Sequence, residues 1–199
     1  VTLLGPVDSQ AYRQLIATSL DSWKAPTAWT RVPQPLVERK PARLAFDTPD
    51  KTNASLQAYH AVPVSAIGMD SEYFGLELAT RIFGGGPGSR LWQRLREGGG
   101  LSYSAGAGLS ASSYERAGRF SLGAEVAPHN LSAAEKALQE ELARSLKDGF
   151  TATEVDAFKK QYVADRQRGR SGDGWAMAFM NGQMEFNYAK DEREKNDAL

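Results

Sequence analysis

Residues 89–103, SRLWQRLREGGGLSY, carry three local structural signals in succession. Ser89 can cap a short helix, because its hydroxyl can accept a hydrogen bond from an amide of the first turn. Apolar residues then recur at helical spacing: Leu91, Trp92 and Leu95. Glycines at 98–100 end the helix, and the residues that follow alternate as in a strand. The stretch therefore predicts a helix, a turn and a strand, with Arg96 and Tyr103 on either side of the turn.

The flanking sequence predicts an antiparallel sheet covered by helices. Strand-like patterns occupy residues 1–7, 43–46, 55–64, 101–108 and 119–126, and residues 111–118 form the turn between the last two. Helices are expected after Asp8 or Ser9, over 70–83, from Ser89, after the capping boxes Ser132–Glu135 and Thr151–Glu154, and beyond Gly172. Residues 25–41 hold four prolines and should be an extended connection. The fold class is therefore α+β, a two-layer sandwich of a mainly antiparallel sheet and helices.

Length and composition favour one globular domain. A chain of 199 residues with 41% hydrophobic and 24% charged side chains fits a single domain, here expected over residues 1–189, with a polar tail at 190–199. Its formal charge of zero gives no field to attract nucleic acid. No apolar run is long enough for a membrane span. Because the chain starts at Val1 without a methionine, we expect a fragment of a longer chain.

Composition also limits metal and nucleotide chemistry. The chain has no cysteine, and its two histidines, His60 and His129, are too far apart for H-x-x-E-H or H-E-x-x-H. His60 is expected to be a partly buried strand residue rather than a ligand. The glycines of residues 84–88 lack the lysine of a phosphate-binding loop, which favours a hinge between helices over a nucleotide site. No metal site is predicted in this chain.

Arg96 and Tyr103 are the candidate functional residues. A guanidinium and a phenol that lie together could both donate hydrogen bonds to a carbonyl oxygen and to the charge it gains when attacked. From the residue types alone, a surface arginine beside a half-buried strand tyrosine remains the simpler interpretation.

These segments resemble the metal-free, C-terminal-type domain of pitrilysin/insulinase-like zinc peptidases, a family related to the mitochondrial processing peptidases. The resemblance rests on Phe83 to Gly86, on Ser89-Arg90-Leu91, on Leu95-Arg96-Glu97 and on Leu101-Ser102-Tyr103, together with the order of elements. It implies a processing-peptidase-like fold. In that family, a catalytic domain carries H-x-x-E-H, and a homologous partner domain without the metal closes over the substrate.

By this resemblance the chain is the partner domain of a zinc metalloendopeptidase and is not active alone. Tyr103 would stabilise the oxyanion, Arg96 would hold the substrate backbone or position the tyrosine, and Gly84, Gly85 and Gly86 would contact substrate. Zinc would belong to the catalytic domain, present in cis or in trans, and the substrate would be a peptide or unfolded protein. The alternative is a non-catalytic scaffold or peptide-binding domain of the same fold. Bacterial periplasm and cytoplasm both fit.

Overall fold

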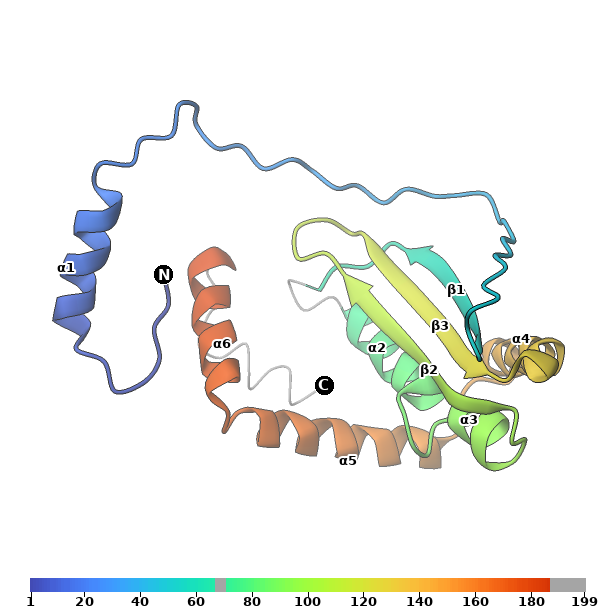
Figure 1. Cartoon of the computed structure of the whole chain (residues 1–199). Coiled ribbons are helices and arrows are strands. Elements are labelled where there is room, and N and C mark those ends of the chain that lie inside the picture. The colour runs from blue at the N-terminus through green and yellow to red at the C-terminus, as the bar shows by residue number, and fades with distance from the viewer. Residues whose placement is uncertain (67–70, 187–199) are drawn as a thin grey trace. The chain divides into compact units, whose positions relative to one another are not determined.

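The computed structural model describes residues 1–66 and 71–186, which form two compact units (Figure 1). The first, here called the terminal unit, combines Val1–Val32 with the described residues from Gln161 onward. The second, called the sheet unit, is Pro33–Lys160. Arg96 and Tyr103 both belong to the sheet unit, so its architecture determines how they are placed.

Three antiparallel strands form the sheet, in the order β1-β3-β2. Their bounds are β1 Ala54–Val62, β2 Ser102–Ala111 and β3 Gly118–Val126. The register aligns Leu56, Ala124 and Ala105 across the three strands, and these side chains belong to the hydrophobic core or pack against it. Residues that alternate with the core positions lie on the other surface, which we call the polar face: Ser55, Gln57, Tyr59, Ser104, Gly106, Gly108, Ser121, Gly123 and Glu125.

Helices pack on the core side of the sheet. They are α2 Ser71–Gly84, α3 Arg90–Trp92 with its π-helical continuation η1 Gln93–Glu97, and α4 Leu131–Asp148, which the short 3₁₀ turn η2 Pro128–Asn130 precedes. The following helix, α5 Ala152–Gly169, begins in the sheet unit and ends in the terminal unit. The core is made of apolar residues from these helices and from β2 and β3: Phe83, Leu91, Leu95, Ala105, Leu122, Ala124, Val126, Ala134, Ala137 and Leu138. The expected α+β fold with an antiparallel sheet is confirmed.

The terminal unit contains α1 Ser9–Leu20 and α6 Asp173–Phe186. Asp8 caps α1 as predicted, since its carboxylate accepts hydrogen bonds from the amides of Gln10 and Ala11. In α6, the rings of Trp175 and Phe179 stack at 5.2 Å between centroids. None of the helices in the described residues is both long and apolar enough to cross a membrane.

Several local predictions are confirmed. The hydroxyl of Ser89 accepts a hydrogen bond from the Trp92 amide at 3.5 Å. The capping box at the start of α5 is formed: Thr151 Oγ1 accepts from the Glu154 amide at 3.2 Å, and Glu154 Oε2 accepts from the Thr151 amide at 2.8 Å. The glycines of residues 84–88 connect α2 to α3, and Gly86 and Gly88 adopt positive φ angles of 116° and 85°.

Other local predictions are wrong. Residues 1–7 and 43–46 are not strands, because an apolar run becomes a strand only when another strand pairs with its backbone. The capping box at Ser132–Glu135 is not used, because the η2 turn already leads the chain into α4, which begins at Leu131. His60 lies in β1 but is exposed rather than partly buried. The single domain over residues 1–189 stays a prediction, and the polar tail at 190–199 lies outside the described residues.

Gly84 allows the end of α2 to pack directly on the backbone of β2. A Cβ atom at Gly84 would lie 2.4 Å from the Ala107 amide nitrogen, which is far inside van der Waals contact. We expect Gly84→Ala to lower the free energy of unfolding by about 1–3 kcal/mol, because the helix must move away from the strand. Urea denaturation measures this change.

Gly75→Ala is the matched control in the same helix. Among the described residues, no atom outside the neighbouring backbone of α2 lies within 4 Å of a Cβ at Gly75, so alanine should stabilise α2 by about 0.5–1 kcal/mol. Destabilisation by both substitutions, or by neither, would contradict the packing described for Gly84.

Candidate functional site

Arg96 lies in the π-helical turn η1, where the Gly98 amide donates to the Gln93 carbonyl oxygen at 2.8 Å. Its guanidinium lies over the Trp92 ring at 4.3 Å from the centroid. The Trp92 indole in turn donates from Nε1 to Glu97 Oε1 at 3.0 Å. Stacking on an aromatic face leaves the N–H edges of a guanidinium available to other acceptors. The exposed Arg96 side chain is therefore held in place and still able to donate hydrogen bonds.

Tyr103 lies at a β-bulge at the start of β2. Ser102 pairs with Val126 and Ser104 pairs with Glu125, so Tyr103 is the additional residue between two successive pairs. A bulge bends its strand and changes the direction of the side chain that it carries. The Tyr103 side chain is 58% exposed. Its phenol is therefore accessible from outside the sheet unit.

The glycine turn joins these two residues at short range. Gly100 adopts a positive φ of 58°, and the Leu101 amide donates to the Leu95 carbonyl oxygen at 2.8 Å. Leu95 is fully buried, and Leu101 packs against the core. The turn that separates Arg96 from Tyr103 is therefore anchored at both of its ends. Neither candidate side chain is enclosed in the interior.

The three other predicted contact residues differ in their environments. Gly84 is buried and packs against Ala107, Gly85 is exposed, and Gly86 is partly exposed. Gly84 thus has a clear packing role. Substrate binding by Gly84, Gly85 and Gly86 stays a prediction.

Arg90 forms a cluster that the sequence analysis did not identify. Its guanidinium donates to both carboxylate oxygens of Glu154 at 2.7 and 2.9 Å, to Ser145 Oγ at 3.1 Å and to the Gly149 carbonyl oxygen at 3.0 Å. It also lies 4.6 Å from the centre of the Phe150 ring. These contacts attach α3 to the ends of α4 and α5, and α3 continues directly into the turn that carries Arg96. The only signal in the sequence was the capping box that contains Glu154.

In the Arg90–Glu154 ion pair, each side chain stabilises the charged form of the other. The hydrogen bonds from Arg90, and then those from Thr151, lower the pKa of Glu154 from 4.5 to about 2, although burial acts in the opposite direction. The hydrogen bond with Glu154 is likewise the main cause that raises the pKa of Arg90. Both groups are therefore ionised at neutral pH.

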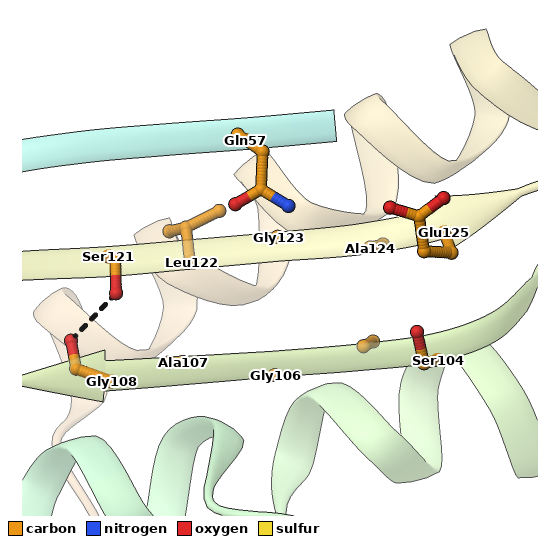
Figure 2. A pocket seen from close by; sticks show the side chains of 11 residues that line it. Gln57, Ser104, Gly106, Ala107, Gly108, Ser121, Leu122, Gly123, Ala124 and Glu125 are labelled. Atoms are coloured by element: carbon orange, nitrogen blue, oxygen red, sulfur yellow. Dashed lines mark hydrogen bonds between the residues drawn. The ribbon is translucent and has the colours of Figure 1, made fainter. Parts of the chain in front are cut away.

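A shallow trough of about 270 Å³ lies on the polar face (Figure 2). Its lining comes from all three strands and includes Gln57, Ser104, Gly106, Gly108, Gly123 and Glu125. At the end of the trough away from Glu125, Ser121 Oγ donates to the Gly108 carbonyl oxygen at 3.2 Å (Figure 2). Tyr103 directly precedes Ser104, so the bulge lies at one end of the trough. The glycines at alternate positions of β2 were the signal that could have identified it.

The described residues contain no cluster of metal-ligating side chains. Within residues 1–66 and 71–186, no three His, Cys, Asp or Glu side chains are arranged to hold a metal ion. The residues present therefore do not fit a zinc site of the kind found in peptidases, which needs three protein ligands.

The family match and three similar solved structures agree with one another, since all of them give peptidases or peptidase domains. A family model described as the peptidase M16 inactive domain matches residues 1–162. A protease from Helicobacter pylori is 18% identical, with a TM-score of 0.70 over 98% of this chain and 48% of that chain. The peptidase M16 inactive domain from Pseudomonas fluorescens is 22% identical, with a TM-score of 0.63 over 74% of this chain and 34% of that chain.

A third similar structure is the periplasmic protease PqqL from Escherichia coli, which is 13% identical with a TM-score of 0.59 over 92% of this chain and 20% of that chain. At these identities the structures show a shared fold. The chain spans less than half the length of each of these three structures. No curated protein matches the sequence significantly.

Proposed function

Because the chain belongs to the peptidase M16 inactive-domain family, we propose that it is the metal-free half of a zinc metallopeptidase and closes over the substrate opposite a homologous catalytic domain. The observation that carries this proposal is the pair of exposed donors, Arg96 stacked on Trp92 and Tyr103 on its bulge, joined by one anchored turn. By the family resemblance, both residues would lie at the substrate cleft.

The partner domain would supply the metal, since this chain's described residues cannot hold it. Bound zinc polarises a carbonyl and lowers the pKa of its water, and a glutamate of the partner would take the proton. The residues of this chain would act from the opposite wall. Tyr103 would donate a hydrogen bond from its hydroxyl to the carbonyl oxygen of the substrate as that oxygen gains negative charge. Arg96 would donate to a backbone carbonyl of the same substrate and hold it in register.

The partner is expected to carry H-x-x-E-H, either in the same polypeptide or in a second chain, and the substrate to be a peptide or unfolded protein. The relation to mitochondrial processing peptidases stays a prediction. The alternative is a non-catalytic scaffold or peptide-binding domain of the same fold, and an experiment must distinguish it from the proposed substrate-closing domain.

Reconstitution with the H-x-x-E-H domain encoded in the same precursor or the adjacent reading frame tests the proposal. Hydrolysis of a fluorogenic peptide should require both domains, and Arg96→Ala should raise KM about tenfold with a smaller effect on kcat, because it removes a contact to the bound substrate backbone. Arg94→Ala is the control two positions away, since Arg94 is exposed and pairs with Glu140. If Arg96→Ala and Arg94→Ala gave the same kinetics, the scaffold interpretation would be supported instead.

A further inference from the structure

The trough on the polar face has a floor with few side chains. Gly123, Gly106 and Gln57 pair in one register row, and Gly108 lies opposite Ser121 two rows further along, in the next row that faces the same side. A Cβ at Gly123 would lie 2.7 Å from Gln57 Nε2, so the glutamine side chain lies over that glycine. Gly106, Gly108 and Gly123 thus add no side chains of their own to this face, and the side chains of Gln57 and Ser121 lie close to Gly123 and Gly108. A ligand that fits such a surface is long, narrow and extended.

Glu125 gives the trough a negative charge at the end near Tyr103. Its register partners are neutral, Ser55 on β1 and Ser104 on β2. The carboxylate is partly buried, and no described residue forms an ion pair or hydrogen bond with its side chain. The other charged residue of β3 is Arg119, which lies about 20 Å further along at about 3.4 Å per residue. Arg119 is therefore too distant to neutralise Glu125.

Partly buried, unpaired carboxylates attract cations, because a cation replaces some of the solvation that burial has removed. Glu125 also lies close to Tyr103 along the sheet, because it faces the bulge across the ladder. Tyr103 and Ser104 are consecutive, and Ser104 faces Glu125 across the ladder. A side chain that reaches Glu125 would belong to a residue within about three positions of the bond that Tyr103 faces, at about 3.4 Å per extended residue.

We propose that the trough binds an extended segment of the substrate and that Glu125 selects a lysine or arginine side chain in that segment, close to the scissile bond. This inference rests on the proposed function for its substrate class, and it adds a specificity determinant that lies outside the Arg96 and Tyr103 pair. Glycines supply room for the peptide backbone, and the single carboxylate supplies the preference for a cation.

Peptide binding to the full chain, measured without the catalytic domain, tests the proposal. Two fluorescein-labelled decapeptides should differ only at one central residue, lysine or norleucine, and their Kd values are read by fluorescence anisotropy. We expect the lysine peptide to bind about five- to tenfold more tightly, as a partly desolvated ion pair worth about 1 kcal/mol requires. Glu125→Gln should abolish this preference, and Glu125→Lys should transfer it to a peptide with a central glutamate.

Glu140→Gln is the control, because Glu140 lies on α4 at the opposite side of the sheet and is paired with Arg94. It should keep the lysine preference. Absence of the preference in the wild type, or its persistence in Glu125→Gln, would overturn the proposal. A second variant, Ser121→Phe, places a ring at the end of the trough away from Glu125, in the path of an extended peptide, and should weaken both peptides at least fivefold. Unchanged binding by that variant would show that the peptide lies elsewhere.

A failure of the Glu125 proposal can be distinguished from a failure of the proposed catalytic function. Tyr103→Phe should keep the lysine preference in the binding assay, because the Glu125 carboxylate is intact. If that variant also turned over substrate normally in the assembled peptidase, the catalytic role would fail while the specificity role of Glu125 remained.

Discussion

Tyr103→Phe in the assembled peptidase should lower kcat about a hundredfold and leave KM nearly unchanged. The phenol hydroxyl is the only group removed, and the proposed hydrogen bond strengthens as the substrate oxygen gains charge. Loss of one such donor costs about 2.7–4 kcal/mol of transition-state stabilisation. Because the side chain is 58% exposed and its ring is retained, folding should be unaffected. Steady-state kinetics with a fluorogenic peptide measures the effect.

Tyr12→Phe is the matched control, since it removes the same hydroxyl from a tyrosine of α1 that is 40% exposed. It should leave both kinetic constants as in the wild type. An equal kcat for Tyr103→Phe and the wild type would exclude Tyr103 from catalysis, and the chain would then act only in binding or assembly.

Arg90→Ala should lower the free energy of unfolding by about 3–5 kcal/mol, the largest stability effect expected in this chain. The guanidinium is 12% exposed and donates to Glu154, Ser145 and the Gly149 carbonyl at once. Its removal leaves the Glu154 carboxylate without its cation, with hydrogen bonds from Thr151 alone, and leaves the other two oxygens without the bonds from Arg90. The melting temperature should fall by about 10 °C. Calorimetry measures it, with Arg94→Ala as the control.

Arg94 and its partner Glu140 are 52% and 50% exposed, and an exposed ion pair contributes about 0–1 kcal/mol. Arg94→Ala should therefore shift the melting temperature by no more than about 3 °C. Similar shifts for the two arginines would mean that the Arg90 cluster does not stabilise the fold beyond an ordinary surface pair.

The same cluster predicts a pH dependence. Glu154 has a pKa of about 2 in the folded chain and 4.5 ordinarily, so the unfolded chain takes up the proton first as the pH falls. The stabilisation is complete above pH 4.5 and disappears as the pH falls toward 2. Glu154→Gln should reduce the slope of unfolding free energy against pH in this range, measured by denaturant titration. An identical slope in the variant would contradict the ion pair.

The sequence-based predictions were most accurate where the interaction joins residues that are close together in the chain. Asp8, Ser89 and the Thr151–Glu154 box were predicted correctly, because a cap bonds amides within three residues. Residues 1–7 and 43–46 were predicted as strands on an apolar pattern alone, and no pairing strand joins them in the structure. The Ser132–Glu135 box matched the local pattern, but the preceding 3₁₀ turn had already begun the helix.

For the candidate site, the sequence alone determined that Arg96 and Tyr103 flank a glycine turn and that the chain has too few clustered histidines and no cysteine to build a zinc site. Only the tertiary structure decided that Tyr103 lies on a bulge and that Glu125 faces Ser104 in a trough made by three strands. It also decided that Arg90 meets Glu154, 64 positions away. Composition and neighbouring residues determine caps, turns and ligand supply, whereas strand register and helix packing determine which distant side chains meet.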